Sequence, residues 1–206
     1  MVKDIYVIEN MVPIPDESSL SKQDCDNLLV FVGKMNYEPN IIAVTYFAKH
    51  IFPTLRQTYH DLTFQIVGAH PTKKVKLLAQ SPGISVTGYV EDIKPYLQKA
   101  TIVVAPMLTG AGVQNKIIQA MSYGCCVVTT PIGAEGLHIQ KEEIGVFDNQ
   151  ESLILGIQNL LKDKNLRKQK GIAARQYVIN NLSEKIVASQ FWEFISAGET
   201  NNKNKK

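Results

Sequence analysis

Residues Ala105 to Thr130 read APMLTGAGVQNKIIQAMSYGCCVVTT, and this stretch decides how the rest of the chain is interpreted. An apolar run, Ile102 to Pro106, precedes a loop with two glycines, Gly110 and Gly112. Apolar residues then recur at helical spacing, and a second apolar run, Cys125 to Thr129, follows them. The stretch therefore predicts a strand, a loop, a helix and a second strand.

The chemistry of this loop favours an anion. Glycines let the backbone approach a ligand closely and allow positive φ. The helix is expected to begin at the glycines, with free N–H groups and a positive dipole end. Lys116 adds a full charge one turn later, on the same helical face as Gly112 and Gln119 and opposite the face expected to meet the sheet. We therefore predict a phosphate or diphosphate site. The alternative is an ordinary βαβ connection whose glycines only make the turn, because G-x-G is a weak motif.

Strand-like runs alternate with helical patterns along the rest of the chain. The further predicted strands are Leu28 to Val32, Leu62 to Val67, Ile84 to Thr87 and Ile144 to Phe147, with Lys3 to Glu9 as another candidate. The predicted helices are Pro39 to Phe52 (with Pro53 bending it or supporting a last turn), Val75 to Gln80, Glu91 to Lys99, Glu151 to Lys162, Asn165 to Ile179 and one from Ser183. This alternation predicts an α/β fold, a Rossmann-like doubly wound parallel sheet with helices on both faces.

Glycine-containing loops follow several of these strands. Parallel strands joined by right-handed crossovers place all their carboxyl ends on one edge, where such sheets bind ligands. The loops expected to meet there contain Gly33-Lys34, Gly68, Gly88-Tyr89 and Thr109 to Gly112.

Composition excludes several classes of protein. The 206 residues are 45% hydrophobic and 20% charged, which is ordinary for a soluble globular domain. A net charge of +3 is too small to indicate nucleic acid. No apolar run is long enough to span a membrane, and the N-terminal residues lack the apolar core of a signal peptide. The three cysteines form no metal or disulfide pattern, and free thiols favour a cytoplasmic location.

A longer string carries a family resemblance. From Pro106 to Leu137 the sequence reads P-x-x-x-G-x-G-V-Q-N-K-I-I-Q-A-M-S-x-G-x-x-V-V-T-T-P-x-G-A-E-G-L. It resembles the donor-site segment of the family 4, or group 1, glycosyltransferases, whose usual form is G-x-G-x-x-x-K-x-x-E-A-M-A-x-G-x-P-V-V-x-T-x-x-G-x-E-G. Two other segments agree in the family's order, FVGKMNYEPN from Phe31 to Asn40 and ISVTGYV from Ile84 to Val90.

The resemblance implies the GT-B architecture, in which two Rossmann-like domains flank a cleft. Only the C-terminal, nucleotide-sugar-binding domain is matched, so we expect either an expressed fragment or a short gene product that is inactive as an isolated half. The expected divisions are a connector at 1–27, a donor-binding domain with C-terminal helices at 28–197 and a disordered tail at 198–206. The expected partners are a nucleotide-sugar, a glycan or lipid-linked acceptor, and the N-terminal acceptor domain. We expect no transmembrane segment, but the full enzyme could associate peripherally with a membrane.

The resemblance also implies roles for individual residues. Lys34 and Lys116 match basic positions that contact the donor diphosphate, and they would stabilise the departing nucleoside diphosphate without a metal or other cofactor. Solvated surface lysines are the alternative. The loop at Gly88 corresponds to the one that holds the base. The expected donor-contacting residues are Gly33, Gly88, Tyr89, Val90, Thr109, Gly110, Ala111, Gly112, Asn115 and Gln119.

Two of these positions depart from the family. Gln119 stands where the family has a Glu that accepts hydrogen bonds from ribose hydroxyls, and it loses the charge-assisted strength of that bond. Thr109 stands where many relatives have a Glu near the donor sugar.

The function implied by the resemblance is donor binding in a retaining glycosyltransferase, with surface-polysaccharide assembly as the expected setting. The alternatives are a degenerate nucleotide- or partner-binding module, as Gln119 hints, and half of a nucleotide-sugar epimerase. A nicotinamide oxidoreductase is disfavoured because no G-x-G-x-x-G follows the first strand.

Overall fold

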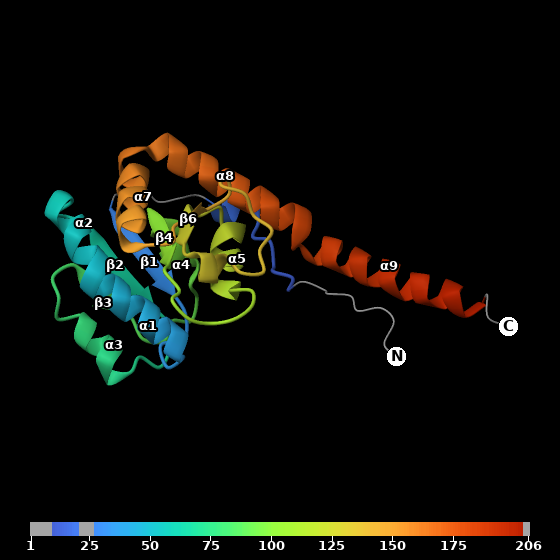
Figure 1. Ribbon diagram of the computed structural model, residues 1–206, viewed down its shortest axis with the longest axis horizontal. Helices are drawn as coiled ribbons and strands as arrows, with labels where there is room; N and C mark the ends of the chain where they lie inside the picture. Colours follow the sequence, from blue (N-terminus) through green and yellow to red (C-terminus); the bar gives the residue numbers. More distant parts are fainter. Residues whose placement is uncertain (1–9, 21–26, 204–206) are drawn as a thin grey trace.

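The computed structural model describes residues 10–20 and 27–203. Within these residues, helices surround a six-stranded sheet (Figure 1). The strands are β1 (Leu28–Val32), β2 (Thr63–Val67), β3 (Ile84–Val86), β4 (Ile102–Ala105), β5 (Val127–Thr129) and β6 (Gly145–Val146). Each lies within a run that predicted it, while the candidate strand Lys3 to Glu9 lies outside the described residues.

The strand order places a crevice in the middle of the sheet. The order is β3-β2-β1-β4-β5-β6, and every neighbouring pair is parallel. From β1 the chain adds β2 and then β3 toward one edge of the sheet. It then returns to β4, beside β1, and adds β5 and β6 toward the other edge. The connections after β1 and β4 therefore leave in opposite directions, which opens a crevice at the carboxyl ends of these two strands. The predicted doubly wound parallel sheet is confirmed.

The central strands β1 and β4 are apolar along their whole length because both faces of the sheet are buried there. In β1, Leu29 and Phe31 belong to one hydrophobic cluster and Val30 belongs to the other. Successive side chains in a strand point to opposite faces, so a sheet covered twice needs continuous apolar runs rather than alternation.

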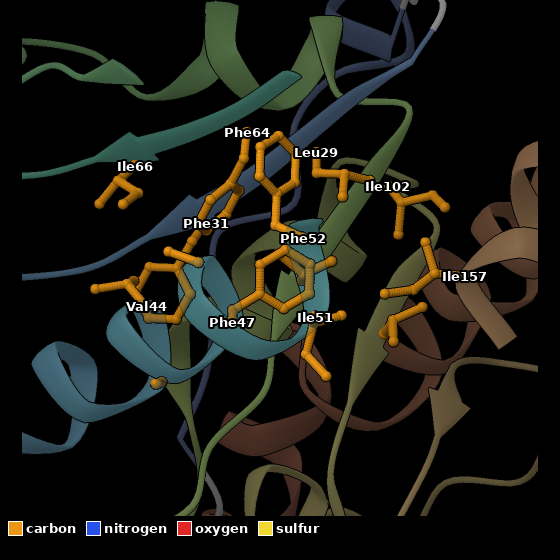
Figure 2. Close-up of a cluster of buried hydrophobic side chains, with 14 of the residues drawn as sticks. Leu29, Phe31, Val44, Phe47, Ile51, Phe52, Phe64, Ile66, Ile102 and Ile157 are labelled. Atoms are coloured by element: carbon orange, nitrogen blue, oxygen red, sulfur yellow. The ribbon is translucent and has the colours of Figure 1, made fainter. Parts of the chain in front are cut away.

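Helices pack on each face. One face carries α1 (Glu38–Tyr46), α2 (Phe52–Thr58), α3 (Lys73–Leu78) and α7 (Gln150–Lys162). The other carries α4 (Lys94–Lys99), α5 (Asn115–Ser122) and α8 (Lys164–Asn181). Figure 2 shows the first core, where Phe31 and Phe64 from the sheet lie among Phe47 and Phe52 from the helices. The ring centroids of Phe47 and Phe64 are 4.8 Å apart in a tilted arrangement, which is favourable for aromatic pairs.

A π-helical segment, Phe47–Ile51, joins α1 to α2. Pro53 lies in the first turn of α2, directly after the π-helical segment, so the N–H that it lacks is missing where the regular i−4 hydrogen-bond pattern is already interrupted. Pro53 was expected to bend the helix or to support its last turn. Instead it lies near the beginning of a further α-helical segment, which continues to Thr58.

Several boundaries differ from the expectations, and among them α4 begins at Lys94 rather than at Glu91. Helix α5 begins at Asn115, three residues after Gly112, because Val113 and Gln114 continue the loop. The segment Pro131–Ala134, expected to be a loop, forms the short helix α6, capped by the Thr130 side chain. Helix α9 (Glu184–Lys203) continues beyond Gly198, where disorder was expected to begin.

Helix α9 projects from the body as an arm (Figure 1). Its side chains Phe191, Trp192 and Phe194 are exposed. None of the helices in the described part of the chain combines the length and the hydropathy that crossing a membrane requires.

Candidate functional site

The crevice between β1 and β4 brings two predicted loops together. The loop after β1 contains Gly33 and Lys34, and the loop after β4 contains Gly110 and Gly112. A Cβ added at Gly110 would lie 3.9 Å from Cβ of Pro39, so the second loop lies against the beginning of α1. The predicted convergence of these two loops is therefore observed.

The glycine loop has the backbone conformation that requires glycine. Gly110 has φ +125° and Gly112 has φ +71°, which is the region that other residues rarely adopt. A Cβ added at Gly112 would meet no atom within 4 Å, so conformation rather than packing selects glycine there. Thr109 and Ala111, which flank these positions, are exposed, so this backbone is open to a ligand.

Helix α5 presents an uncapped N-terminus to this loop. Gln114 is the N-cap residue and makes no side-chain capping hydrogen bond. Instead its Nε2 donates to the Gly112 carbonyl oxygen at 3.1 Å. The first N–H groups of a helix need acceptors from outside the helix, and an anion can supply them.

Lys116 lies in the crevice and not on the outer helix surface where its helical position predicted it. Its Nζ is 5.9 Å from the centroid of the Phe31 ring, which belongs to β1. It is 3.8 Å from Sδ of Met107, which follows β4. Nζ also donates a hydrogen bond to Gln114 Oε1 at 2.8 Å.

Burial changes the acidity of this lysine. Desolvation lowers the pKa of Lys116 from 10.5 to about 8. The ammonium group is thus held in a partly dehydrated crevice, with a neutral carboxamide as its hydrogen-bond acceptor. A cation in this setting interacts with an incoming phosphate more strongly than a fully solvated one does.

Gln114 is a residue of the candidate site that the sequence did not indicate. It is buried, and its carboxamide connects the glycine loop to Lys116 by the two hydrogen bonds described above. A polar residue before a predicted helix looks like an exposed loop residue, and no spacing rule distinguishes it. Its contacts with Gly112 and Lys116 become visible only in three dimensions.

The β1 side of the crevice is built differently. Lys34 is exposed, and its carbonyl oxygen accepts a hydrogen bond from Asn40 Nδ2 at 3.0 Å. Gly33 lies against Gly68, where an added Cβ would be 1.7 Å from the Gly33 carbonyl oxygen. This close backbone contact joins the loops after β1 and β2. Asn40 is buried, and its Oδ1 has no hydrogen-bond partner among the described residues.

The loop after β3 faces a different groove. Gly88 has φ +77°, and its carbonyl oxygen accepts from Thr87 Oγ1 at 2.9 Å. Tyr89 is 77% exposed, and it lines with Val90 a groove of about 570 Å³ that also includes Gln65 and Tyr96.

Two other predicted residues, Asn115 and Gln119, line a separate groove of about 430 Å³ along α5. Tyr89 and Val90 thus line one groove, and Asn115 and Gln119 line the other.

A metal centre is not indicated in the part of the chain that the structure describes. No group of three or more His, Cys, Asp or Glu residues there could hold an ion. Cys125 and Cys126 are buried, and Cys125 Sγ donates a hydrogen bond to the Leu97 carbonyl oxygen at 3.4 Å. Cys25 lies outside the described residues.

Comparison with known proteins gives the family. Residues 26–163 match the family profile described as "Glycosyl transferases group 1". A curated relative, an uncharacterized 44.6 kDa protein in the cps region of Klebsiella pneumoniae, is 25% identical over 194 residues. The aligned part covers 88% of this chain and 50% of the relative, so the chain spans about half the length of that protein.

Solved structures agree with this fold. The Anabaena protein HepE, solved in complex with UDP and glucose, superposes with a TM-score of 0.72 at 17% identity, covering 93% of this chain and 56% of HepE. The C-terminal domain of the group 1 family protein LpcC from Francisella tularensis superposes with a TM-score of 0.63 at 17% identity, covering 77% of this chain and 88% of that domain. With its six-stranded parallel sheet of the GT-B type, the chain belongs to the group 1 glycosyl transferases.

Proposed function

We propose that this chain is the donor-binding domain of a retaining glycosyltransferase. It binds a nucleotide-diphospho-sugar at the crevice, and the sugar passes to a glycan or lipid-linked acceptor held by a second domain. The observation that carries this proposal is the position of Lys116, whose partly dehydrated ammonium group lies beside the uncapped end of α5. A cation, a helix N-terminus and a glycine loop at a switch point together form a receptor suited to a diphosphate.

Three groups would act on the leaving group. Lys116 and the first N–H groups of α5 stabilise the negative charge that develops on the diphosphate as the glycosidic bond breaks. Lys34 adds a more distant, solvated charge from the other wall. The acceptor hydroxyl attacks the anomeric carbon on the face that the diphosphate leaves, and the departing diphosphate takes up the proton. This scheme needs no protein base, metal or other cofactor.

The comparisons support the substrate class and the setting. HepE was solved with UDP and glucose, which are the product nucleotide and the sugar of a nucleotide-sugar donor. The Klebsiella pneumoniae relative is encoded in a cps region, which supports surface-polysaccharide assembly. The cysteines form no metal or disulfide pattern in the sequence, which favours a reducing compartment, and we place the domain in the cytoplasm.

A calorimetric titration of the chain with UDP, GDP, ADP and CDP, without added metal, tests this proposal. We expect saturable binding of one diphosphate, which would also identify the donor class. Failure of all four to bind a chain that is shown to be folded would overturn the proposal. A second assay supplies donor and acceptor to the chain alone, and we expect no transfer because the acceptor domain is part of the proposed enzyme.

One observation favours a second candidate, a non-catalytic nucleotide-binding module. Gln119 replaces a Glu of the resembling family, and its side chain lines the groove along α5. A Gln119→Glu variant tests whether this position contacts the ribose. If position 119 contacts the ribose, the variant should bind the nucleoside diphosphate more tightly relative to inorganic diphosphate. The same affinity ratio for both proteins would remove residue 119 from the nucleoside site.

A further inference from the structure

The described part of the connector is docked on the domain. The Val12 N–H donates to the Leu182 carbonyl oxygen at 3.0 Å. Arg175 donates from Nη2 to the Pro15 carbonyl oxygen at 2.6 Å, and its Nη1 donates to the Ser122 carbonyl oxygen at the end of α5. Val12 and Ile14 also pack against the second core. The connector is therefore held against α5 and α8 at several points.

The docked connector forms one wall of a groove. Asn10 Nδ2 donates to Asn115 Oδ1 at 3.2 Å, which joins the connector to the first residue of α5. The groove of about 430 Å³ is enclosed by Asn10, Met11, Val12, Asn115, Ile118 and Gln119. It begins at the same helix end that the proposed diphosphate site uses.

The polar groups of this groove suit hydroxyls. With the hydrogen bond between them in place, Asn10 still has a carbonyl oxygen to accept, and Asn115 still has an amide N–H to donate. One hydroxyl can donate to the first and accept from the second. None of the residues that line the groove carries a formal charge, so neither a phosphate nor a metal ion is favoured inside it. A polyol attached to a phosphate fits this combination of a neutral groove and an adjacent helix N-terminus.

We propose that Asn10 of the connector is a specificity residue, which together with Asn115 binds a ribose hydroxyl of the nucleoside diphosphate. This inference rests on the proposed function, because the diphosphate at α5 places the ribose at the entrance of the groove. It extends the binding site beyond the Rossmann-like domain to a segment more than 100 positions away in sequence.

Calorimetry on Asn10→Ala tests the proposal, with the nucleoside diphosphate that binds best and with its 2′-deoxy and 3′-deoxy forms. We expect Asn10→Ala to weaken binding of the parent ligand by about threefold to tenfold, the usual effect of losing one neutral hydrogen bond. The deoxy ligand that lacks the contacted hydroxyl should bind the wild type and the variant equally. Asn180→Ala, at an exposed position on α8, serves as the matched control and should change none of the affinities. Thermal unfolding of each variant shows whether it is folded.

The other outcomes overturn the inference in distinguishable ways. An equal loss of affinity for all three ligands would mean that Asn10 only supports the structure. An effect seen with the nucleotide-sugar but not with the nucleoside diphosphate would assign the groove to the sugar and contradict a ribose contact. An unchanged affinity in Asn10→Ala would leave the proposed function standing without the connector. If no nucleoside diphosphate binds the folded wild type, the proposed function and this inference both fall.

Discussion

Lys116 and Lys34 belong to the segments that follow two neighbouring strands, β4 and β1, yet their surroundings differ. Lys116 reaches inward from α5 toward Phe31 and Met107, and burial lowers its pKa to about 8. Lys34 follows β1 and is exposed. We expected both residues to contact the donor diphosphate, but only Lys116 has lost part of its hydration before a ligand arrives.

This difference should decide how each lysine acts on an anion. A buried ammonium group has already lost water, so its interaction with a phosphate is screened little. An exposed one exchanges water for phosphate and is weakened by salt. We therefore expect Lys116 to determine affinity and Lys34 to contribute mainly through long-range attraction.

The largest expected effect is that of Lys116→Ala on nucleoside diphosphate binding. Removal of a charge-assisted hydrogen bond should cost about 1.5–3 kcal/mol, or roughly tenfold to a hundredfold in affinity. Isothermal calorimetry measures it, and Lys162→Ala, an exposed lysine at the end of α7, is the control. A Lys116→Ala protein that binds as tightly as the wild type would remove this residue from the site.

The affinity for the nucleoside diphosphate should also depend on pH, through the titration of Lys116. Because the free protein has a Lys116 pKa of about 8, binding above that pH must first restore the proton. Affinity should fall by about tenfold per pH unit from pH 8 upward, until the pKa of the bound state is reached. Titrations between pH 7 and 10 measure this slope, and Lys116→Met should abolish it. The same slope in both proteins would point to another titrating group.

A smaller effect is expected on stability. The Lys116 pKa is lower in the folded than in the unfolded chain, so between about pH 8 and 10.5 the unfolded chain holds more protons and stability rises with pH. Below pH 8 the penalty of burying the charge is fully present. Lys116→Met should therefore stabilise the chain at pH 7 by about 1 kcal/mol, after allowance for residual solvent, and less at pH 10. Denaturant unfolding at both pH values measures the stability of Lys116→Met, with Lys34→Met as a control. A difference in stability that is the same at both pH values would mean that burial of the charge is not the cause.

The smallest effect is expected for Lys34→Ala. Loss of an exposed charge should weaken diphosphate binding by about 0.2–1 kcal/mol at low salt, and the difference should shrink as salt is added. Calorimetry at low and high ionic strength measures it. If Lys34→Ala lost as much affinity as Lys116→Ala, the proposed difference between the buried and the exposed lysine would be wrong.

Much of the fold could be predicted because strands that are buried on both faces appear in the sequence as continuous apolar runs. Runs such as Leu28 to Val32 are apolar throughout, and glycine follows the strands where the backbone must turn. The order of the strands could not be predicted, because β1 has the same pattern whichever strand lies beside it. The family string predicted the donor-contacting residues, and of these Gly110 and Gly112 have the backbone conformations that their identity suggested.

The arrangement of the site could be predicted only in part. Helical periodicity placed Lys116 on the outer face of α5, but a long flexible side chain can extend its ammonium group some distance from its Cα. Whether it turns inward depends on Gln114, which holds Nζ from the loop before the helix. The connector wall could not be predicted either, because the contact between Asn10 and Asn115 joins positions that no local pattern relates.

The projecting helix α9 has a practical consequence for spectroscopy. Trp192 is the single tryptophan of the chain, and it is 65% exposed on this arm, outside both hydrophobic cores. Its emission should therefore change little when the sheet melts but should shift to the blue when another surface covers the arm. Intrinsic fluorescence of this protein would thus monitor association along α9, whereas circular dichroism would have to follow unfolding.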